Sequence, residues 1–253
     1  MSSRVIVTAG GAGIGRVIAA AFAAEGARVH VCDVDSDALA VAGEIPGVVP
    51  ARVDVADEAA LDHWLEGAIA ELGGVDVLVN NAGTSGPTAP VEDISLEDWR
   101  RCLAVCLDSQ FLCARRVAPV MKRQRSGSIV NLSSTAGLFG YGHRTPYAAA
   151  KWAVIGLTKS LAVELGPFDV RVNAICPGPV EGERMTRVIE AEARLRGSDP
   201  ADVRAEYTQG SSIARFVDPS EIADACLFLS SPAARMISGQ ALAVDGHTET
   251  FHL

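Results

Sequence analysis

The sequence predicts an α/β fold in which a seven-stranded, mostly parallel sheet is doubly wound, with helices on both faces. Short apolar runs alternate along the 253-residue chain with longer segments of helical periodicity. The run Val75–Val79 is apolar after Asp76, as expected of a strand buried on both faces of a parallel sheet. The first strand also leads through a glycine-rich turn into a helix. We therefore expect one domain over residues 1–253.

Seven apolar runs account for the predicted strands. They are Arg4–Thr8, Arg28–Cys32, Val48–Val53, Val75–Val79, Ser128–Leu132, Val170–Ile175 and Ala241–Val244. Helices are expected at Ile14–Glu25, Asp35–Ala42, Glu58–Leu72, Ser95–Gln124, Tyr147–Leu165 and Ser220–Leu229. The charged segment 181–217 is longer than an ordinary connection, and we expect it to act as a lid.

The turn after the first strand contains Gly10, Gly11, Gly13 and Gly15. Glycines let the main chain approach a diphosphate closely, and the helix that opens near Ile14 has free N–H groups to receive one. A turn of this kind without other signals is as often only a tight turn.

The second strand leads to Asp33, whose carboxylate can accept from ribose hydroxyls and repel a 2′-phosphate. Val34 adds no positive charge beside it, and Arg16 is the nearby base that argues otherwise. NAD is therefore favoured over NADP. The alternative is that Asp33 caps the helix Asp35–Ala42.

The fourth strand delivers the run Asn80-Asn81-Ala82-Gly83 to its carboxyl end. Ligands bind at this edge in doubly wound sheets. Asn81 is accordingly a candidate contact for a cofactor.

A long helix is expected at Ser95–Gln124, with Ser95 as its N-cap and Asp98 completing a capping box. Cys102 and Cys106 share one face of this helix. We interpret both cysteines as small buried apolar residues and not as reactive thiols.

Tyr147 and Lys151 are four residues apart on a predicted helix, which places both on one face. A fixed cation nearby favours the ionised form of a phenol, so this pair can transfer a proton at neutral pH. Ser134 follows the fifth strand, and its hydroxyl can face the same pocket. Each piece alone is weak, because such pairs mostly lie on solvated helices and such serines mostly cap turns.

Four motifs in this order resemble the short-chain dehydrogenases/reductases, and the resemblance covers nearly the whole chain. They are Thr8-x-x-x-Ala12-Gly13-Ile14-Gly15, Asn80-Asn81-Ala82-Gly83, Ser134 and Tyr147-x-x-x-Lys151. The resemblance implies a Rossmann-like fold and NAD-dependent interconversion of a secondary alcohol and a ketone. It assigns Tyr147 as acid/base, Lys151 to promoting the ionised phenol and holding the nicotinamide ribose, and Ser134 to positioning the substrate oxygen.

The same resemblance implies further cofactor contacts. Asp54 and Val55 stand where the family brackets the adenine, although Asp54 or Asp57 can instead cap the helix Glu58–Leu72. The complete expected cofactor-binding set is Gly10, Gly11, Gly13, Ile14, Gly15, Asp33, Asp54, Val55, Asn81, Ala82, Gly83, Tyr147, Lys151, Pro177, Gly178 and Val180.

Three positions depart from the family pattern. Ala9 stands where a glycine usually follows the threonine, and Gly182 stands where a threonine usually meets the nicotinamide. Cys106 stands where the family commonly has an asparagine, which holds a water beside the lysine through its carbonyl group and a local helix distortion. Since Cys106 retains a carbonyl group, that relay can survive.

The Gly-rich loop Ala136–Thr145 lies between two catalytic elements and is expected to form one wall of the substrate pocket. His143 or Arg144 can bind a carboxylate or phosphate of the substrate. Arg144 is at least as well explained as an anchor for the loop or a bridge between subunits.

Composition excludes several classes of function. A net charge of −9 and a pI near 5.0 argue against a nucleic-acid partner. Six cysteines without metal spacing indicate free thiols and no metal site. No apolar stretch is long enough to span a membrane, and the first strand begins too early for a signal peptide, so we expect a cytoplasmic protein.

Two rival functions share part of this pattern. A 3-oxoacyl-thioester reductase would need a basic surface for an acidic carrier, which five residues offer: Arg115, Arg116, Lys122, Arg123 and Arg125. A catalytically quiet NAD-binding or scaffold protein would explain the departures, but not the intact Ser134, Tyr147 and Lys151. The long helices Ser95–Gln124 and Tyr147–Leu165 resemble those that pair in family tetramers, so we expect a homotetramer.

Overall fold

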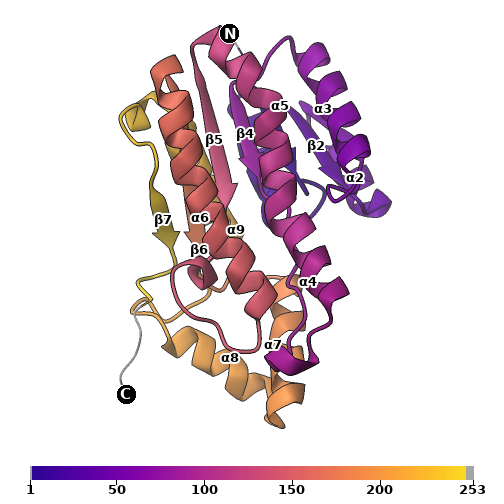
Figure 1. Cartoon of the computed structure of the whole chain (residues 1–253), viewed down its shortest axis with the longest axis vertical. Coiled ribbons are helices and arrows are strands. Elements are labelled where there is room, and N and C mark those ends of the chain that lie inside the picture. The colour runs from indigo at the N-terminus through magenta and orange to yellow at the C-terminus, as the bar shows by residue number, and fades with distance from the viewer. Residues whose placement is uncertain (1, 249–253) are drawn as a thin grey trace.

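Seven strands form one fully parallel sheet in the computed structural model, which describes residues 2–248 (Figure 1). Their order across the sheet is β3-β2-β1-β4-β5-β6-β7. The strands are β1 (Arg4–Thr8), β2 (Arg28–Asp33), β3 (Val48–Arg52), β4 (Val77–Asn80), β5 (Gly127–Leu132), β6 (Val170–Pro177) and β7 (Ala241–Val244). The predicted doubly wound α/β fold is confirmed. β4 begins two residues later than expected, and β6 continues two residues further.

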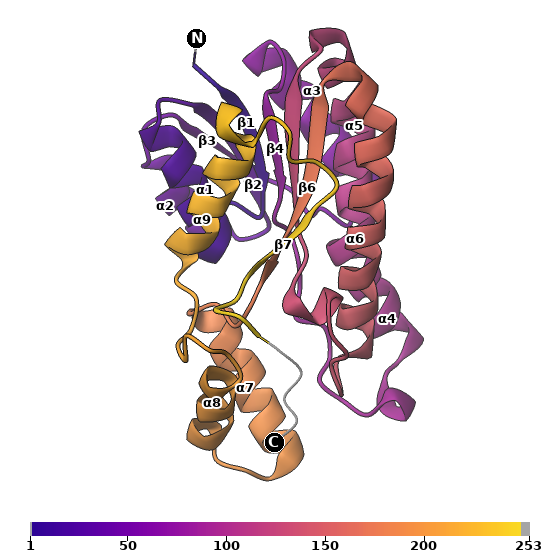
Figure 2. The same ribbon diagram turned by 90° about the vertical axis from the view of Figure 1, so that its left-hand side faces the viewer.

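Helices cover both faces of this sheet (Figure 2). One layer contains α1 (Gly13–Ala24), α2 (Ser36–Gly43) and α9 (Pro219–Ser230). The other contains α3 (Glu58–Leu72), α5 (Ser109–Gln124) and α6 (Thr145–Leu165). Each layer packs a separate apolar core against the sheet, with Ile18 and Ile222 in the first core and Leu61 and Leu165 in the second.

Alternation along β1 assigns its side chains to these two cores. Val5 and Val7 contribute to the core under α1 and α9, while Ile6 contributes to the core under α3 and α5. All three are fully buried, because helices cover both faces of the sheet. The apolar runs that predicted central strands follow from this double coverage.

The predicted helix Ser95–Gln124 is confirmed in outline, and a π-helical turn interrupts it at the position where the family resemblance implies a local distortion. Ser95 does cap α4 (Leu96–Leu103), but a π-helical turn (Ala104–Asp108) separates α4 from α5. At this turn the Ser109 hydroxyl donates to the Val105 carbonyl at 2.7 Å, and the Gln110 amide donates to the Cys106 carbonyl at 3.2 Å. Side chains that bond to main-chain carbonyl groups in this way compete with the regular hydrogen bonds from residue i to residue i−4 of the helix.

Two further helices project beyond the carboxyl ends of the strands (Figures 1 and 2). They are α7 (Glu183–Arg196) and α8 (Pro200–Gln209), and they lie between β6 and α9 in the chain. A small core joins them to the following segment through Ile189, Ala193, Val203 and Phe216. The charged 181–217 segment is therefore a folded helical pair at the edge where the sheet presents its loops.

Candidate active site

Strand order reverses between β1 and β4, and the loops that leave these two strands meet at this point. In an open parallel sheet such a reversal opens a crevice at the carboxyl edge. The turn after β1 and the run Asn81–Gly83 after β4 both lie there. The predicted glycine turn and the predicted run Asn81–Gly83 are thus at the same edge of the sheet.

The glycine turn leaves no room for side chains at two of its positions. A Cβ atom on Gly10 would lie 2.6 Å from Cβ of Val31, and one on Gly15 would lie 2.0 Å from the Ala9 carbonyl oxygen. Both distances are far below a normal contact, so glycine is required at each. The helix α1 that follows has no side-chain N-cap, which leaves its first N–H groups available to an anion.

Ala9, the first departure from the family pattern, has a φ of 51°. This is the left-handed region, where glycine carries no penalty and an alanine does. The turn is therefore feasible with Ala9, and the usual preference for glycine at this position has a direct conformational reason.

Asn81 holds the glycine turn in place. Its side-chain amide donates to the carbonyl oxygens of Thr8 and Ala9, both at 3.0 Å. The Thr8 hydroxyl in turn accepts from the main-chain N–H groups of Asn81 and Ala82 at 3.0 Å. Since both amide hydrogens of Asn81 are occupied, this side chain shapes the crevice through the main chain. The tie between Thr8 and Asn81 was not predicted.

Asp33 faces the glycine turn. One carboxylate oxygen accepts from the Gly11 N–H at 3.1 Å, and the other accepts from Val34 at 2.8 Å. The cap of α2 is Asp35, which accepts from Asp37 and Ala38. The alternative interpretation of Asp33 as the helix cap is therefore wrong.

Asp54 also leaves the capping role to another residue, because Asp57 caps α3. Asp54 accepts from the Ala56 N–H at 2.9 Å and pairs with Arg101 at 3.0 Å. Burial raises the pKa of Asp54, but the hydrogen bonds from Ala56 and Arg101 outweigh it and the pKa is lowered. Val55 beside it is buried.

A hollow of about 410 Å³ adjoins this end of the crevice. Its lining residues come from the ends of β2 and β3 and from the start of α3: Val34, Arg52, Val53, Asp54, Asp57 and Ala60. Asp54, one of the predicted cofactor residues, lines this hollow.

Tyr147 and Lys151 come together on α6, as their spacing predicts. The Lys151 ammonium lies 5.6 Å from the centre of the Tyr147 ring and donates to the Leu132 carbonyl at 2.7 Å. Lys151 is only 3% exposed, and the described residues place no carboxylate against it.

Ser134 opens the short 3₁₀ turn that follows β5 (Thr135–Gly137), and its hydroxyl accepts from the Ala136 N–H at 3.1 Å. Its neighbour Ser133 donates to the Lys151 carbonyl at 2.8 Å. These contacts dock the turn against α6, on the helix that carries the other two predicted catalytic residues. The hydroxyl hydrogen of Ser134 is left available to a ligand, while its oxygen caps the turn.

Cys106, the second departure, is fully buried at the π-helical turn. Its sulfur accepts from the Thr84 N–H at 3.3 Å, which ties the turn to the loop after β4. The hydrogen bond from Cys102 lowers the pKa of the Cys106 thiol, with a further contribution from Lys151, whereas burial opposes this. The sulfur thus serves as an acceptor at the position where the family commonly has an amide.

Gln110 was missed by the sequence reasoning. Its amide donates to the carbonyl oxygens of Cys106 and Leu132, both at 3.2 Å. Leu132 is also the acceptor for Lys151, so Gln110 and the lysine share one carbonyl. The Cys106 carbonyl therefore already has a protein partner. A glutamine on the buried face of a helix was the available signal.

Arg144 anchors the loop before α6 and is 4% exposed. Its guanidinium donates to the Ser85 carbonyl at 2.6 and 3.1 Å. It lies 5.3 Å from the ring centre of Tyr141 and 4.9 Å from that of Tyr147. Of the alternatives for Arg144, loop anchoring is what these contacts show. His143 has a φ of 59°.

The turn after β6 closes the opposite wall. A Cβ atom on Gly178 would lie 2.9 Å from the Asp245 main chain, and Val180 forms an isolated bridge with Val217. Gly182, the third departure, has a φ of 142° and opens α7 without a side-chain cap. Two residues later, Arg184 donates to the Gly83 carbonyl at 2.7 Å. The contact from α7 to the β4 loop was not predicted.

A second contact joins the helical pair to the loop Ala136–Thr145. The hydroxyls of Tyr141 and Tyr207 contact one another, and Tyr207 donates to Glu192 at 2.8 Å. Since Tyr207 is on α8 and Glu192 on α7, this contact links both helices to the loop beside Tyr147.

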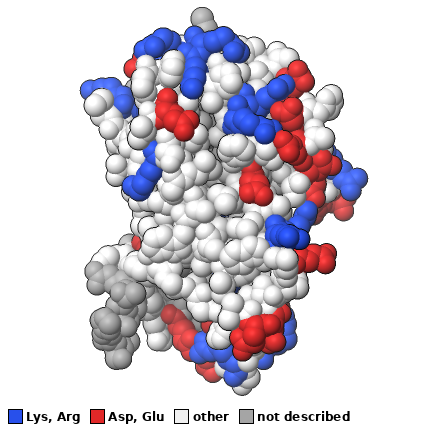
Figure 3. All heavy atoms as spheres, viewed as in Figure 1, with Lys and Arg blue, Asp and Glu red and all other residues white. Residues whose placement is uncertain are grey.

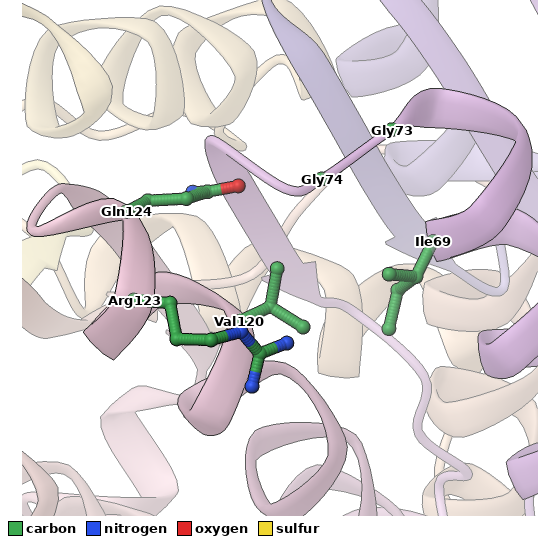
Figure 4. A pocket seen from close by; sticks show the side chains of 6 residues that line it. All are labelled: Ile69, Gly73, Gly74, Val120, Arg123 and Gln124. Carbon is green, nitrogen blue, oxygen red and sulfur yellow. The ribbon is translucent and has the colours of Figure 1, made fainter.

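The hollow drawn in Figure 4 lies at the other end of the sheet. Its lining includes Gly73 and Gly74, which precede β4, and Gln124, which precedes β5. It therefore lies at the amino edge, away from Tyr147 and Lys151. The described residues contain no group of three or more His, Cys, Asp or Glu side chains placed to hold a metal ion. Among residues 2–248, no helix has the length and apolar character needed to cross a membrane.

A doubly wound parallel sheet with Ser134, Tyr147 and Lys151 near its carboxyl edge is typical of nicotinamide-dependent oxidoreductases. A family model described as enoyl-(acyl carrier protein) reductase matches residues 8–247. The chain is 37% identical over 245 residues to a cis-4-hydroxycyclohexanecarboxylate dehydrogenase of Sinomonas cyclohexanicum, covering 95% of this chain and 94% of that one. The chain belongs to the short-chain dehydrogenase/reductase family, as the motifs predicted.

Two solved structures are similar over nearly the whole chain. An NAD⁺-bound xylitol dehydrogenase has a TM-score of 0.91 at 30% identity and covers 96% of this chain and 97% of its own. An actinorhodin polyketide ketoreductase with NADPH has a TM-score of 0.92 at 32% identity and covers 97% and 96%. The protein is an NAD(P)-dependent oxidoreductase that interconverts alcohols and ketones.

Proposed function

We propose that this enzyme uses NAD to oxidise a secondary alcohol of a small polar, hydroxy-acid, polyol or cyclic substrate, or to reduce the matching ketone. One observation carries the proposal: the buried Lys151 ammonium lies 5.6 Å from the ring of Tyr147 at the carboxyl edge of the sheet. This pair, with Ser134 docked against the same helix, provides the proton-transfer group that the reaction requires.

The residues of the crevice fit a nicotinamide dinucleotide. Gly10 and Gly15 let the turn pack closely against Val31 and the Ala9 carbonyl, and the uncapped start of α1 offers N–H groups to a diphosphate. Asp54, Val55 and the run Asn81–Gly83 would bracket the adenosine and nicotinamide halves. Pro177, Gly178 and Val180 would border the nicotinamide. When bound, the cofactor supplies the hydride acceptor or donor.

Asp33 supports NAD over NADP. Its carboxylate lies at the glycine turn, accepting from Gly11 at 3.1 Å, where it can also accept from ribose hydroxyls. A 2′-phosphate at this position would meet a like charge. Arg52, which donates to the Val34 carbonyl at 3.3 Å, is the nearby cation that favours the opposite choice.

In the proposed mechanism the chain moves one proton. Tyr147 takes the hydroxyl proton of the alcohol, and returns it in the reverse direction. Lys151 stabilises the phenolate and holds the nicotinamide ribose. Ser134 donates its free hydroxyl hydrogen to the substrate oxygen and orients it. Such acid/base steps contribute about 10²- to 10⁴-fold in rate, and orientation adds to this.

The first alternative is a 3-oxoacyl-thioester reductase that docks an acidic carrier protein. The predicted basic surface is largely neutralised, because Arg115 pairs with Glu58, Arg116 with Asp62 and Glu66, and Arg125 with Asp169. This pairing favours a small-molecule substrate. The second alternative, a catalytically quiet protein, is disfavoured by the intact pairing of Tyr147 and Lys151.

The contacts of α7 and α8 support a lid over the substrate within a single domain. Arg184 joins the lid to the β4 loop, and Tyr207 joins it to Tyr141. Lid opening would require both contacts to break, which is compatible with exchange of substrate through this side.

We also propose a cytoplasmic homotetramer. All six cysteines are buried free thiols, which suits a reducing compartment. Few charged side chains lie over the middle of the face that α6 and the lower part of α5 present (Figure 3). Phe111, Trp152 and Val163 on these helices are 48%, 53% and 78% exposed, so a partner copy can bury them.

A panel of secondary alcohols assayed with NAD⁺ and NADP⁺ tests the activity and the cofactor together. We expect turnover with at least one alcohol class and a clear preference for NAD⁺. Turnover confined to acyl thioesters would favour the first alternative, and absence of turnover with intact NADH binding would favour the second.

A further inference from the structure

Three cations surround the reacting side of the crevice without a carboxylate to balance them. Arg144 and Lys151 are 4% and 3% exposed, whereas Arg184 on α7 is an exposed residue that donates to the Gly83 carbonyl. Within residues 2–248, none of the three has a carboxylate oxygen within 4.0 Å. The whole chain has a net charge of −9, so this local excess of positive charge is unusual for the molecule.

Of the five arginines on α7 and α8, three form ion pairs, whereas Arg184 and Arg194 form none with the residues that the structure describes. Arg187 pairs with Glu183, Arg196 with Glu192 and Glu206, and Arg204 with Glu181. Arg184 lies between Glu183 and Arg187 in the sequence, yet it forms no ion pair with any residue in 2–248. It donates to the Gly83 carbonyl at 2.7 Å.

The guanidinium of Arg184 lies close to the catalytic lysine. A point that a Cβ atom on Gly83 would occupy is 3.6 Å from the Lys151 ammonium nitrogen, 3.8 Å from the Cys106 sulfur and 3.9 Å from Nη1 of Arg184. Nη2 of Arg184 donates to the Gly83 carbonyl, and Nη1 and the Lys151 nitrogen lie on the border of the same small space beside Gly83. A guanidinium has five donors and matches a carboxylate with two parallel hydrogen bonds.

Acidic groups around this space are already engaged elsewhere. Asp245 is close enough to Cys176 that its negative charge raises the pKa of that thiol, whereas the charge of Lys151 lowers it. The carboxylate oxygens of Asp245 accept from the N–H groups of His247 and Thr248. Arg144 is held by Ser85 and by two aromatic rings, and adds a fixed positive charge next to Tyr147. A ligand that enters beside Tyr147 thus lies near Arg144 and Lys151, while the carboxylates whose charges also act on this region are Asp245 and Glu192.

We propose that the alcohol substrate carries a negatively charged group, with a carboxylate as the best match, and that Arg184 binds it. This inference rests on the proposed function and adds the charge of the substrate to it. Arg144 contributes through its field, and Arg184 through direct hydrogen bonds. The name of the similar cis-4-hydroxycyclohexanecarboxylate dehydrogenase is compatible with such a substrate.

The diphosphate of the cofactor is the competing anion. The glycine turn and the start of α1 already provide its site, and Asn81 separates that turn from Gly83. Arg184 bonds to Gly83, at the far end of the run Asn81–Gly83 from the glycine turn and on the side of Lys151. This position favours a substrate group over the diphosphate.

Matched pairs of substrates test the inference. Each pair consists of a hydroxy acid and its neutral amide, including 4-hydroxycyclohexanecarboxylate and 3-hydroxybutyrate with their carboxamides, assayed for kcat/KM with NAD⁺. For the best pair we expect the wild-type enzyme to prefer the acid at least about tenfold. Arg184→Met should reduce this preference about 10- to 100-fold, because it removes hydrogen bonds to a charged group. Arg184→Lys should retain part of it.

Arg187→Met is the matched control, since Arg187 is on the same helix but pairs with Glu183. It should keep the wild-type preference for the acid. The dissociation constant of NADH, measured by fluorescence, should change less than twofold in Arg184→Met. Equal use of acid and amide by the wild-type enzyme would overturn the inference, as would a loss of NADH affinity as large as the loss of acid preference. Absence of turnover with every alcohol would contradict the proposed function itself.

Discussion

The two halves of the carboxyl edge are built by different means. Around β1, β2 and β4 the crevice is shaped by main chain, with Gly10 and Gly15 in space that no side chain can share and Asn81 bonded to two carbonyl groups. Around β5, β6 and the α7–α8 lid it is shaped by side chains that meet across the gap, such as Arg184 and Tyr207. The first half suits an invariant ligand, whereas the second can change its specificity by single substitutions.

The largest effect is expected from Gly15→Ala, which disturbs the half of the edge that is shaped by main chain. A Cβ atom there would lie 2.0 Å from the Ala9 carbonyl oxygen, so the turn must move. We expect a loss of about 3 kcal/mol in the free energy of unfolding and a loss of measurable NADH binding. Denaturant unfolding and NADH fluorescence check both.

Gly67→Ala is the matched control for this change. Gly67 is on α3, and nothing lies within 4 Å of the Cβ atom it lacks. Alanine should stabilise this helix by up to about 1 kcal/mol and leave NADH binding intact. Similar behaviour of the two variants would show that the turn tolerates a side chain and that its main chain is not the constraint we describe.

A second test of the half shaped by main chain concerns the preference of the enzyme for NAD⁺ over NADP⁺. Asp33→Ser with Val34→Arg removes a carboxylate and adds a phosphate partner, so the preference should move towards NADP⁺ by at least about a hundredfold. The ratio of kcat/KM for the two cofactors measures this shift. Asp37→Ser, which removes an exposed carboxylate of α2, should leave the ratio unchanged. A wild-type enzyme that uses NADP⁺ as efficiently as NAD⁺ would mean that Asp33 does not contact the ribose.

The side-chain half should respond more gently. Tyr207→Phe removes the hydroxyl that contacts Tyr141 and donates to Glu192 at 2.8 Å. We expect KM for the alcohol to rise about fivefold, as one hydrogen bond is worth about 1 kcal/mol, with little change in Tm. Hydrogen exchange over residues 183–209 should become faster.

Thr208→Ala is the control for the lid, because the Thr208 hydroxyl bonds only within α8, to the Ala205 carbonyl. It should leave KM and hydrogen exchange unchanged. If Tyr207→Phe behaves like this control, the contact between Tyr207 and Tyr141 does not hold the lid.

Predictability from sequence follows the same division. Glycine spacing, the strand alternation of Val5, Ile6 and Val7, and the i to i+4 pair of Tyr147 and Lys151 all reflect local geometry, and the structure places them as expected. Local rules did not decide which acidic residue caps each helix. The structure shows that Asp35 and Asp57 have those roles.

The contacts that sequence reasoning missed join residues far apart in the chain. Arg184 and Gly83 are 101 residues apart, and Tyr141 and Tyr207 are 66 apart. At the π-helical turn, Gln110 bonds both to its own helix, at Cys106, and to β5, at Leu132. No periodicity within one element encodes such pairs, so only the folded chain shows them.

The central claim is that Tyr147 transfers the proton while the main-chain half binds the cofactor independently. The Tyr147→Phe variant tests it most directly, since the ring that packs between Arg144 and Lys151 is kept and only the hydroxyl is removed. We predict that kcat for alcohol oxidation with NAD⁺ falls by about 10²- to 10⁴-fold or more, while the dissociation constant of NADH changes less than twofold. Turnover within a few-fold of wild type, with NADH bound normally, would contradict the account.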